Sequence, residues 1–418
     1  MRRELLAGLT TFLTMAYILA VNPGMLGLIG NGMTPGAVFT ATAIASAIAT
    51  LVMAFAANLP VALAPGMGLN AFFAFTVVLG MGFSWQLALT AVFLEGILFI
   101  ILSLFNVREA IINAIPSSLK KAVAVGIGLF IALIGFSNAG IVVQGAGTVV
   151  GLGDLSHPSP LMALVGLIII MVLYSLKIPG AILIGIIGTT IISVAFRITA
   201  IPEGWSPISM PAAPLLFKFD FSSIFTFDFF IVFFTFLFVD IFDTVGTLVG
   251  VTTQAGLVDK NGNIPRVKQA LLADAIGTVT GAALGTSTVT SYIESAAGVA
   301  AGGKTGLTAF STGILFLLAL VLSPIFLLIP GFATAPALIF VGFLMMAPVV
   351  EITFKDPTEG IPAFLAIVMM PFAYSIAEGI VYGLLSYVLL KAATGKFKEI
   401  PIVTWALFAV FVLRFLIS

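Results

Sequence analysis

The sequence contains no cysteine, only one histidine and few charged residues. Without cysteine, the 418-residue chain has no disulfide, no thiolate metal site and no cysteine nucleophile. Lys plus Arg and Asp plus Glu number 17 each, so no excess of charge indicates a nucleic acid or an acidic surface as partner. Charged residues make up 8% of the chain and hydrophobic residues 61%. Repeated apolar runs with this composition are typical of a multi-pass membrane protein.

Fourteen apolar segments predict an all-α polytopic fold, with seven segments on each side of a polar, proline-rich break at about 201–222. They lie near 4–22, 37–57, 60–80, 83–105, 117–136, 160–176 and 179–196, then near 227–250, 266–284, 286–303, 307–328, 332–350, 361–376 and 378–393. Because each half has an odd number of segments, halves 1–200 and 223–395 would be inverted repeats, a common plan of secondary transporters. The remaining stretch, 396–418, is predicted as an apolar helix that either lies along the interface or forms an extra span.

The distribution of Lys and Arg predicts the orientation in the cell membrane, because cytoplasmic connections collect basic residues. With a cytoplasmic N-terminus, most basic residues fall in cytoplasmic connections; these are Arg108, Lys120, Lys121, Lys177, Lys260, Arg266, Lys268, Lys304, Lys355, Lys391, Lys396 and Lys398. The longest outer connection, 137–160, has none, and only Arg197 and Lys218 lie on the outer side.

Segments three and ten each begin with a stretch that breaks helices. LPVALAPGMGLNAFF (59–73) carries two prolines and two glycines, and AALGTSTVTSYIESA (282–296) contains a glycine followed by a β-branched run. Extended backbone at membrane depth is tolerated only where it is buried in protein or lines a cavity. We therefore expect two short antiparallel strands that pair with each other beside a ligand site.

Carboxylates lie within these apolar segments. Asp240 and Asp243 fall in 227–250, and Glu294 follows the β-branched run. A charged side chain at the bilayer centre costs about 2.5 to 3.5 kcal/mol, so such residues usually face a bundle interior or a polar cavity. Asp240, Asp243 and Thr247 are spaced i, i+3, i+7 and share one helical stripe. All three acids are candidates for proton coupling, because burial favours proton uptake by a carboxylate near neutral pH. For Asp240 the alternative is a structural hydrogen bond to a neighbouring helix.

Other motifs are interpreted more simply. Glu95 and Asp274 lie in unbroken helices and are expected to tie helices together. GVAAGGKT (298–305) fits the phosphate-loop pattern but follows a membrane half-helix and no soluble nucleotide domain. GLGD (151–154) copies an intramembrane aspartyl protease signature within a polar loop, without a partner Tyr-Asp, and His157 lies in the same loop. Neither catalytic residues, a metal site nor a cofactor is predicted.

Four motifs carry a resemblance that covers essentially the whole chain. They are TTFLTMAYILAVNPGML (10–26), PGMGLNAFF (65–73), DTVGT (243–247) and YIESAAGV (292–299). The sequence resembles the AzgA-type adenine/guanine/hypoxanthine permeases, a branch of the nucleobase transporters related to the uracil/xanthine and nucleobase-ascorbate carriers. This resemblance implies a core domain of 1–106 plus 223–328, a gate domain of 117–200 plus 332–395, and a purine between the two strands.

The resemblance also implies site residues. The acidic positions of the family match Asp243 and Glu294, its asparagine matches Asn70, and Thr247 stands where the uracil carrier has a histidine. The candidate substrate-binding residues are Asp243, Glu294, Asn70, Gly68, Ala71, Thr247, Thr290 and Ser291.

We thus expect a secondary active transporter, not an enzyme, that imports purine nucleobases by proton symport with alternating access. Carriers of uracil, xanthine or an anion on the same fold remain alternatives, and a channel is disfavoured because the polar groups concentrate at one depth. Beyond purine, proton and lipid bilayer, the sequence leaves open Na+ in place of H+ and a homodimer.

Overall fold

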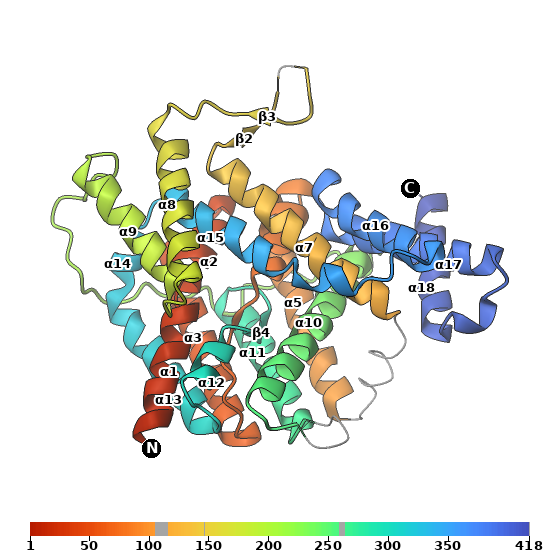
Figure 1. Ribbon diagram of the computed structural model, residues 1–418, viewed down its shortest axis with the longest axis horizontal. Coiled ribbons are helices and arrows are strands. Elements are labelled where there is room, and N and C mark those ends of the chain that lie inside the picture. Colours follow the sequence, from red (N-terminus) through yellow and green to blue (C-terminus); the bar gives the residue numbers. More distant parts are fainter. Residues whose placement is uncertain (105–115, 146, 259–263, 418) are drawn as a thin grey trace.

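The computed structural model is a bundle of helices with two very short sheets (Figure 1). It describes residues 1–104, 116–145, 147–258 and 264–417, so Arg108 and Lys260, both assigned to cytoplasmic connections, lie outside the described residues. Nine helices within these ranges are long and apolar enough to cross a membrane, and four more are apolar but shorter. The mostly helical membrane fold is therefore confirmed, whereas the count of fourteen segments stays a prediction.

The first half of the chain contains α1 to α9. The helices are α1 (Arg2–Met15), α2 (Ile18–Leu26), α3 (Pro35–Val52), α4 (Met67–Ala71), α5 (Trp85–Leu104), α7 (Ser117–Asn138), α8 (Pro158–Ser175) and α9 (Ala181–Ala195). Helical stretches η1 (Gly27–Ile29), η2 (Met53–Ala57) and η3 (Phe72–Gly80) extend α2, α3 and α4. The predicted segment 4–22 thus consists of two helices, α1 and α2, separated by a turn at Ala16 and Tyr17.

The second half contains α10 to α18. The helices are α10 (Phe227–Gln254), α11 (Val267–Leu284), α12 (Ser295–Ala300), α13 (Gly306–Ala319), α14 (Ser323–Leu327), α15 (Gly331–Leu344), α16 (Pro357–Phe372), α17 (Ile376–Ala393) and α18 (Ile402–Ile417). Three 3-10 turns lie between them: η4 (Leu320–Leu322), η5 (Ala347–Glu351) and η6 (Phe397–Glu399).

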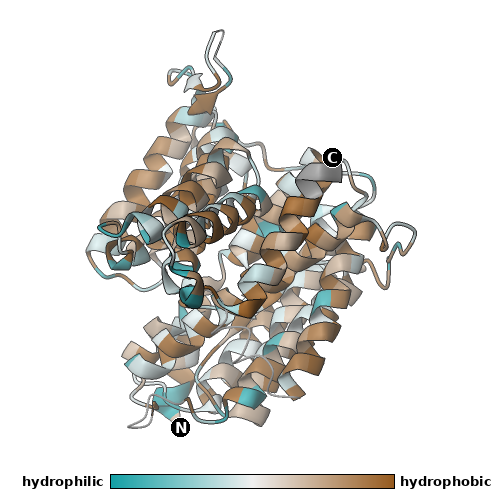
Figure 2. Ribbon diagram, turned by 90° about the vertical axis from the view of Figure 1, so that its right-hand side faces the viewer, coloured by the Kyte–Doolittle hydropathy of each residue, from teal (hydrophilic) through white to brown (hydrophobic). Residues whose placement is uncertain are grey.

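The helices pack in two groups, each drawn from both halves of the chain. In one group, α5 and α3 pack on α11, and α1 and α3 pack on α13. In the other, α7 packs on α15 and α16, and α8 packs on α9 and α15. Hydrophobic residues predominate along the helices (Figure 2), and several of their side chains, including Phe55 and Phe372, are largely exposed. An exposed apolar surface of this kind suits a lipid environment.

Two pairs of strands interrupt the helices. β1 (Leu63–Pro65) pairs antiparallel with β4 (Val289–Ser291), where the helix-breaking stretches predicted strands. β2 (Val142–Val143) and β3 (Gly151–Leu152) form a hairpin in the 137–160 connection, which the sequence did not indicate. β3 and the two residues after it contain the GLGD sequence, so this motif lies in the same connection and its Asp154 is exposed.

Gly285 makes the change from α11 to β4 possible. Its φ of +94° is a left-handed conformation that L side chains rarely adopt, and it ends α11. A Cβ at this position would also lie 2.6 Å from Leu215 Cβ, in the connection between the two halves. The chain can therefore leave the helix here and enter the extended β4 segment.

Candidate functional site

The paired strands form the centre of the candidate site. Ala64 pairs with Thr290 in the middle of the two strands, and all six strand residues are buried. The pairing continues on both sides, because Gly66 N donates to Thr288 O at 3.0 Å and Tyr292 N donates to Ala62 O at 2.9 Å. Strand pairing thus satisfies backbone groups that would otherwise be unpaired inside the bundle.

Asp243 of α10 and Glu294, just before α12, are the partly exposed acids of the site. Gly66, directly after β1, lies beside Asp243: a Cβ on Gly66 would be 3.6 Å from Asp243 Oδ2 and 2.6 Å from Thr290 Cγ2. The lack of a side chain at Gly66 therefore keeps the space between the strands and Asp243 open.

Tyr17 holds Glu294 in place. Its hydroxyl donates a hydrogen bond of 2.6 Å to Glu294 Oε1, and the ring is 1% exposed. Tyr17 lies in the turn between α1 and α2, so the interruption of the first segment positions this hydroxyl. The motif at 10–26 contains Tyr17, yet its role was not predicted, because nothing in the local sequence shows that segment one reaches segment ten.

Asn70 and Tyr292 connect the two broken segments. Tyr292 Oη donates to Pro65 O at 2.6 Å, and Asn70 Nδ2 donates to the same oxygen at 3.4 Å. Asn70 Oδ1 accepts a hydrogen bond from the Ser287 hydroxyl. The predicted Asn70 is fully buried and links segment three to segment ten through Ser287, a partner that sequence reasoning missed, as it missed the bond from Tyr292 to Pro65.

A second layer of acids lies behind β4, where Asp240, Asp274 and Glu95 are fully buried. Thr244 of α10 donates to Asp274 Oδ1 of α11 at 2.7 Å and lies 3.4 Å from Asp240 Oδ1. Glu95 accepts from Thr288 at 3.4 Å. Asp274 joins two helices and Glu95 joins α5 to the segment before β4. Asp240 lies with them rather than beside the partly exposed Asp243.

The hydroxyls of β4 face this second layer. Thr290 Oγ1 lies 2.7 Å from Thr244 Oγ1, and Ser291 Oγ donates to Asp274 Oδ1 at 3.5 Å. Because the single hydroxyl proton of Thr244 is donated to Asp274, Thr290 is the donor in its pair with Thr244. These two predicted site residues therefore connect the strands with the buried acids.

The remaining predicted residues belong to helices next to the strands. Ala71 is fully buried in α4 and Thr247 is 7% exposed in α10. Gly68 packs against the other helix group, because a Cβ on it would lie 2.6 Å from Ile127 Cγ2 of α7. Within the described ranges, no cluster of three or more His, Asp or Glu side chains has the geometry of a metal site.

In the phosphate-loop sequence, the backbone N–H groups that could bind a phosphate already bind a carboxylate of the protein. The Glu4 side chain accepts hydrogen bonds from the backbone N–H groups of Lys304 and Thr305 at 3.2 to 3.3 Å, and from the Thr308 hydroxyl. Asn58 Oδ1 accepts from Gly306 N at 2.9 Å at the start of α13. Glu4 and Asn58 thus satisfy the donors that a phosphate would use.

The sequence profile of the Xan_ur_permease family, described as "Permease family", matches residues 2–382. The chain belongs to this family. Adenine permease AdeQ of Escherichia coli is 44% identical over 100% of this chain and 93% of the relative. Guanine/hypoxanthine permease PbuG of Bacillus subtilis is 47% identical over 99% of this chain and 96% of the relative. The resemblance to purine permeases is therefore confirmed.

Solved structures with the same fold are transporters as well. The transmembrane domain of the cyanobacterial bicarbonate transporter BicA superimposes with a TM-score of 0.67 at 16% identity, covering 91% of this permease and 97% of that domain. SLC26A9 gives a TM-score of 0.66 at 14% identity, covering 93% and 65%. These likenesses establish the membrane transporter fold of the permease.

Proposed function

We propose that this permease imports the purine nucleobases adenine, guanine and hypoxanthine by secondary active transport. The observation that carries the proposal is the placement of two partly exposed carboxylates, Asp243 and Glu294, beside a pair of strands in the middle of the bundle. Relatives named as adenine and as guanine/hypoxanthine permeases support it. The enzyme class is disfavoured, because these relatives are permeases.

The chemistry of the site suits a purine. A purine base is flat and uncharged, with N–H donors and ring-nitrogen or carbonyl acceptors along its edges. The carboxylates of Asp243 and Glu294 accept from N–H groups, and aromatic side chains can cover the faces of the ring. Uracil or xanthine remains the alternative substrate, and the uptake assay below includes both.

An anion fits the site less well. The neighbours in fold include a bicarbonate transporter and an anion transporter. Asp243 and Glu294 would repel an anion at low dielectric, where like charges interact strongly. A channel is also disfavoured, because the acids and hydroxyls gather around one pair of strands rather than along a pore.

We further propose that transport is proton-coupled and proceeds by alternating access. Asp243 and Glu294 share the site with substrate, and Asp240 is the third candidate for a coupling role. The helix group of α1–α5 with α10–α13 is assigned to the core domain, and the group of α7–α9 with α15–α17 to the gate domain. Binding of a proton and a purine at one site couples the two, because each favours the other.

Uptake in a transport-deficient cell tests the function. Labelled adenine, guanine, hypoxanthine, xanthine and uracil are supplied with and without a protonophore. We expect the cells to accumulate adenine, guanine and hypoxanthine, and the protonophore to abolish this accumulation. A Glu294→Ala variant present in the membrane in equal amount should accumulate none of them. Accumulation of uracil alone would contradict the proposed substrate class. Accumulation that survives the protonophore would contradict proton coupling.

A further inference from the structure

The C-terminal helix α18 lies beyond the residues matched by the family profile and contacts both helix groups. It packs on α17 of the proposed gate domain. It also contacts α10 of the proposed core domain, because the Phe411 ring lies 6.0 Å from the Phe234 ring in an edge-to-face arrangement. An element that contacts both domains is placed to influence how they move.

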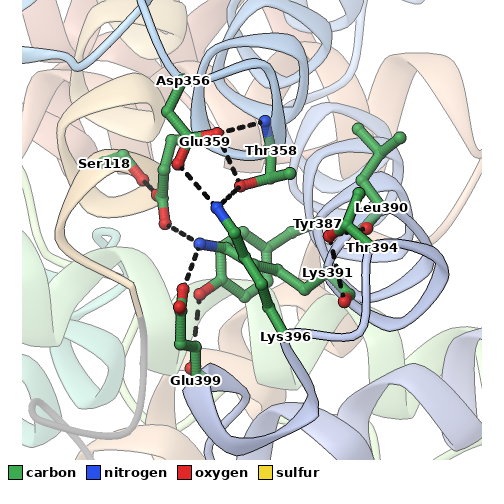
Figure 3. Close-up of polar contacts among 10 residues, drawn as sticks. All are labelled: Ser118, Asp356, Thr358, Glu359, Tyr387, Leu390, Lys391, Thr394, Lys396 and Glu399. Atoms are coloured by element: carbon green, nitrogen blue, oxygen red, sulfur yellow. Dashed lines mark hydrogen bonds and ion pairs between the residues drawn. The ribbon is translucent and has the colours of Figure 1, made fainter.

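The base of α18 is fixed by a cluster of charged side chains (Figure 3). Lys391, near the end of α17, is 2% exposed, and its Nζ lies 2.7 Å from Glu359 Oε1 and 2.6 Å from Glu399 Oε2. Glu359 belongs to α16 and also accepts a hydrogen bond from Ser118 of α7. Glu399 lies three residues before Ile402, the first residue of α18. We call these side chains, Ser118, Glu359, Lys391 and Glu399, the anchor.

A third ion pair reinforces the anchor. Lys396 Nζ lies 3.1 Å from Asp356 Oδ2, and the other Asp356 oxygen accepts from Thr358 N and Oγ1. The Thr358 hydrogen bonds, with Lys396, hold the pKa of Asp356 at about 2, and the bond from Lys391 holds the pKa of Glu399 below its usual range. A carboxyl whose pKa is lowered in the folded state adds to the free energy of unfolding at every pH above its unfolded-state pKa of about 4. This contribution is lost as the pH falls through the folded-state pKa. The ion pairs therefore persist at neutral pH.

One stripe of α18 is buried. Thr404, Leu407 and Phe411 are 0%, 9% and 1% exposed and are spaced i, i+3, i+7, whereas Ile402 is 86% and Leu413 50% exposed. That spacing puts the buried residues on one helical face. Phe411 is nine residues beyond Ile402, about 13 Å along a helix. The buried face therefore extends well away from the anchor, and Phe411 near its far end contacts Phe234 of α10.

The surface that receives Phe411 is a row of phenylalanines along α10. Ring-centroid distances are 6.4 Å for Phe230–Phe234, 5.7 Å for Phe234–Phe238 and 4.7 Å for Phe238–Phe242. We call Phe230, Phe234, Phe238 and Phe242 the ladder. Because its members are one helical turn apart, a ring that leaves Phe234 meets an equivalent ring about 6 Å further along the axis. Such one-turn displacements of packed elements occur in conformational transitions.

We propose that α18 is a strap between the two domains: the anchor fixes its base to the gate domain, and Phe411 moves along the ladder of the core domain during transport. This inference rests on the proposed alternating access. The anchor restrains one end while the aromatic contact at the other end can be exchanged without exposing a polar group. The strap therefore limits how far the domains separate and permits movement along α10.

Cross-linking tests the strap on a background without native cysteine. The Phe234→Cys/Phe411→Cys pair is reconstituted in liposomes and joined by a short reducible thiol cross-linker. We expect adenine uptake to stop on cross-linking and to return on reduction, while equilibrium adenine binding is retained. The matched control is Tyr174→Cys/Phe340→Cys, an aromatic pair 4.8 Å apart between α8 and α15 of the gate domain, whose cross-link should leave uptake unchanged.

Three outcomes would overturn the strap. One is unchanged uptake after cross-linking of the Phe234/Phe411 pair; another is the absence of this cross-link while the control pair forms. The third uses Phe411→Cys combined with either Phe230→Cys or Phe238→Cys. If Phe411 moves along the ladder, adenine should change the cross-link yield of at least one of these pairs. A yield that adenine changes in neither pair would contradict the strap. Absence of purine uptake by the unmodified protein would instead contradict the proposed function, so the two failures are distinguishable.

The anchor has a separate test. Lys391→Met should lower the yield of the Phe234/Phe411 cross-link, and Lys391→Arg should restore it, because arginine keeps the charge. If Lys391→Met does not fold, Glu399→Gln replaces it, since Glu399 is 53% exposed and its loss disturbs the interior less. An unchanged cross-link yield in a folded anchor variant would contradict the role of the anchor.

Discussion

At the residue scale, exposure separates five acids near the paired strands into two classes. Asp240, Asp274 and Glu95 are fully buried behind β4 and bound to threonine hydroxyls, whereas Asp243 and Glu294 are partly exposed. Only the second class therefore presents surface that is accessible in this conformation. From the sequence, Glu95 and Asp274 could be separated from the site acids but Asp240 was grouped with Asp243, because exposure depends on neighbours from other helices.

Tyr17→Phe should weaken purine binding, because the ring stays and only the hydrogen bond to Glu294 is lost. Such a bond contributes about 1.5 to 3 kcal/mol to stability, and the part that positions Glu294 is lost from binding, so we expect Kd to rise by up to roughly tenfold. Tyr174→Phe is the matched control, because Tyr174 is 47% exposed on α8. Titration of both purified variants with labelled adenine measures the effect, and equal affinities would remove Tyr17 from the site.

Asp243→Asn should separate binding from accumulation. Asparagine resembles the protonated carboxyl in shape but cannot release a proton. We expect the variant to bind purine with a weaker dependence on pH and to exchange it across liposomes, while it no longer concentrates it. Counterflow and proton-driven uptake at several pH values are compared. A variant that retained proton-driven accumulation would assign the coupling role to Glu294 or Asp240.

At the element scale, the strand-bearing segments depend on glycines that permit close approach. Gly68→Ala places a Cβ 2.6 Å from Ile127 Cγ2, and overpacking of this kind costs about 1 to 3 kcal/mol. We expect a lower Tm and slower uptake. Gly246→Ala in α10 meets open space and should be neutral or stabilising, because alanine favours helices by about 1 kcal/mol over glycine.

The pair Gly68→Ala/Ile127→Ala completes this experiment, because it removes the atom that the new methyl group would meet. Coupled neighbours give non-additive effects in such a cycle. We expect the double variant to regain part of the uptake rate lost by Gly68→Ala. Additive losses would show that the contact between α4 and α7 does not set the rate.

Glu4 explains why the phosphate-loop sequence should not bind nucleotide. Glu4→Ala leaves the backbone donors of Lys304 and Thr305 without their carboxylate, so we expect a lower Tm and a cost of about 1 to 3 kcal/mol. Glu4→Gln keeps an acceptor oxygen and should lose less. Thermal unfolding with and without Mg-ATP is the measurement, and stabilisation of the unaltered protein by Mg-ATP would contradict this assignment.

The sequence predicted the elements better than their contacts. Proline, glycine and β-branched residues located both strands, because backbone preferences are local. The turn at Tyr17, the bridge from Asn70 to Ser287 and the β2–β3 hairpin were not predicted. Each depends on residues that are distant in sequence or on a loop without a strong pattern. The family resemblance supplied Asn70, and only the fold supplied its partners.

At the scale of the whole molecule, orientation in the membrane stays a prediction based on basic residues. The structure places Lys304 and Lys398 in exposed connections that follow α12 and α17, and Ser156 in the exposed connection before α8. The segment order puts the first two positions on the cytoplasmic side and the third outside. The three positions therefore report on the whole arrangement at once.

Single cysteines at these positions test the orientation, because the chain has no native cysteine to give a background signal. Intact cells that express Ser156→Cys, Lys304→Cys or Lys398→Cys are treated with a membrane-impermeant thiol reagent. We expect labelling of Ser156→Cys in intact cells and of the other two only after permeabilisation, because a charged reagent does not cross the hydrocarbon layer. The unaltered protein is the control for non-specific labelling. The reverse pattern would invert the topology, and labelling of Lys304→Cys but not Lys398→Cys in intact cells would place an odd number of spans between them.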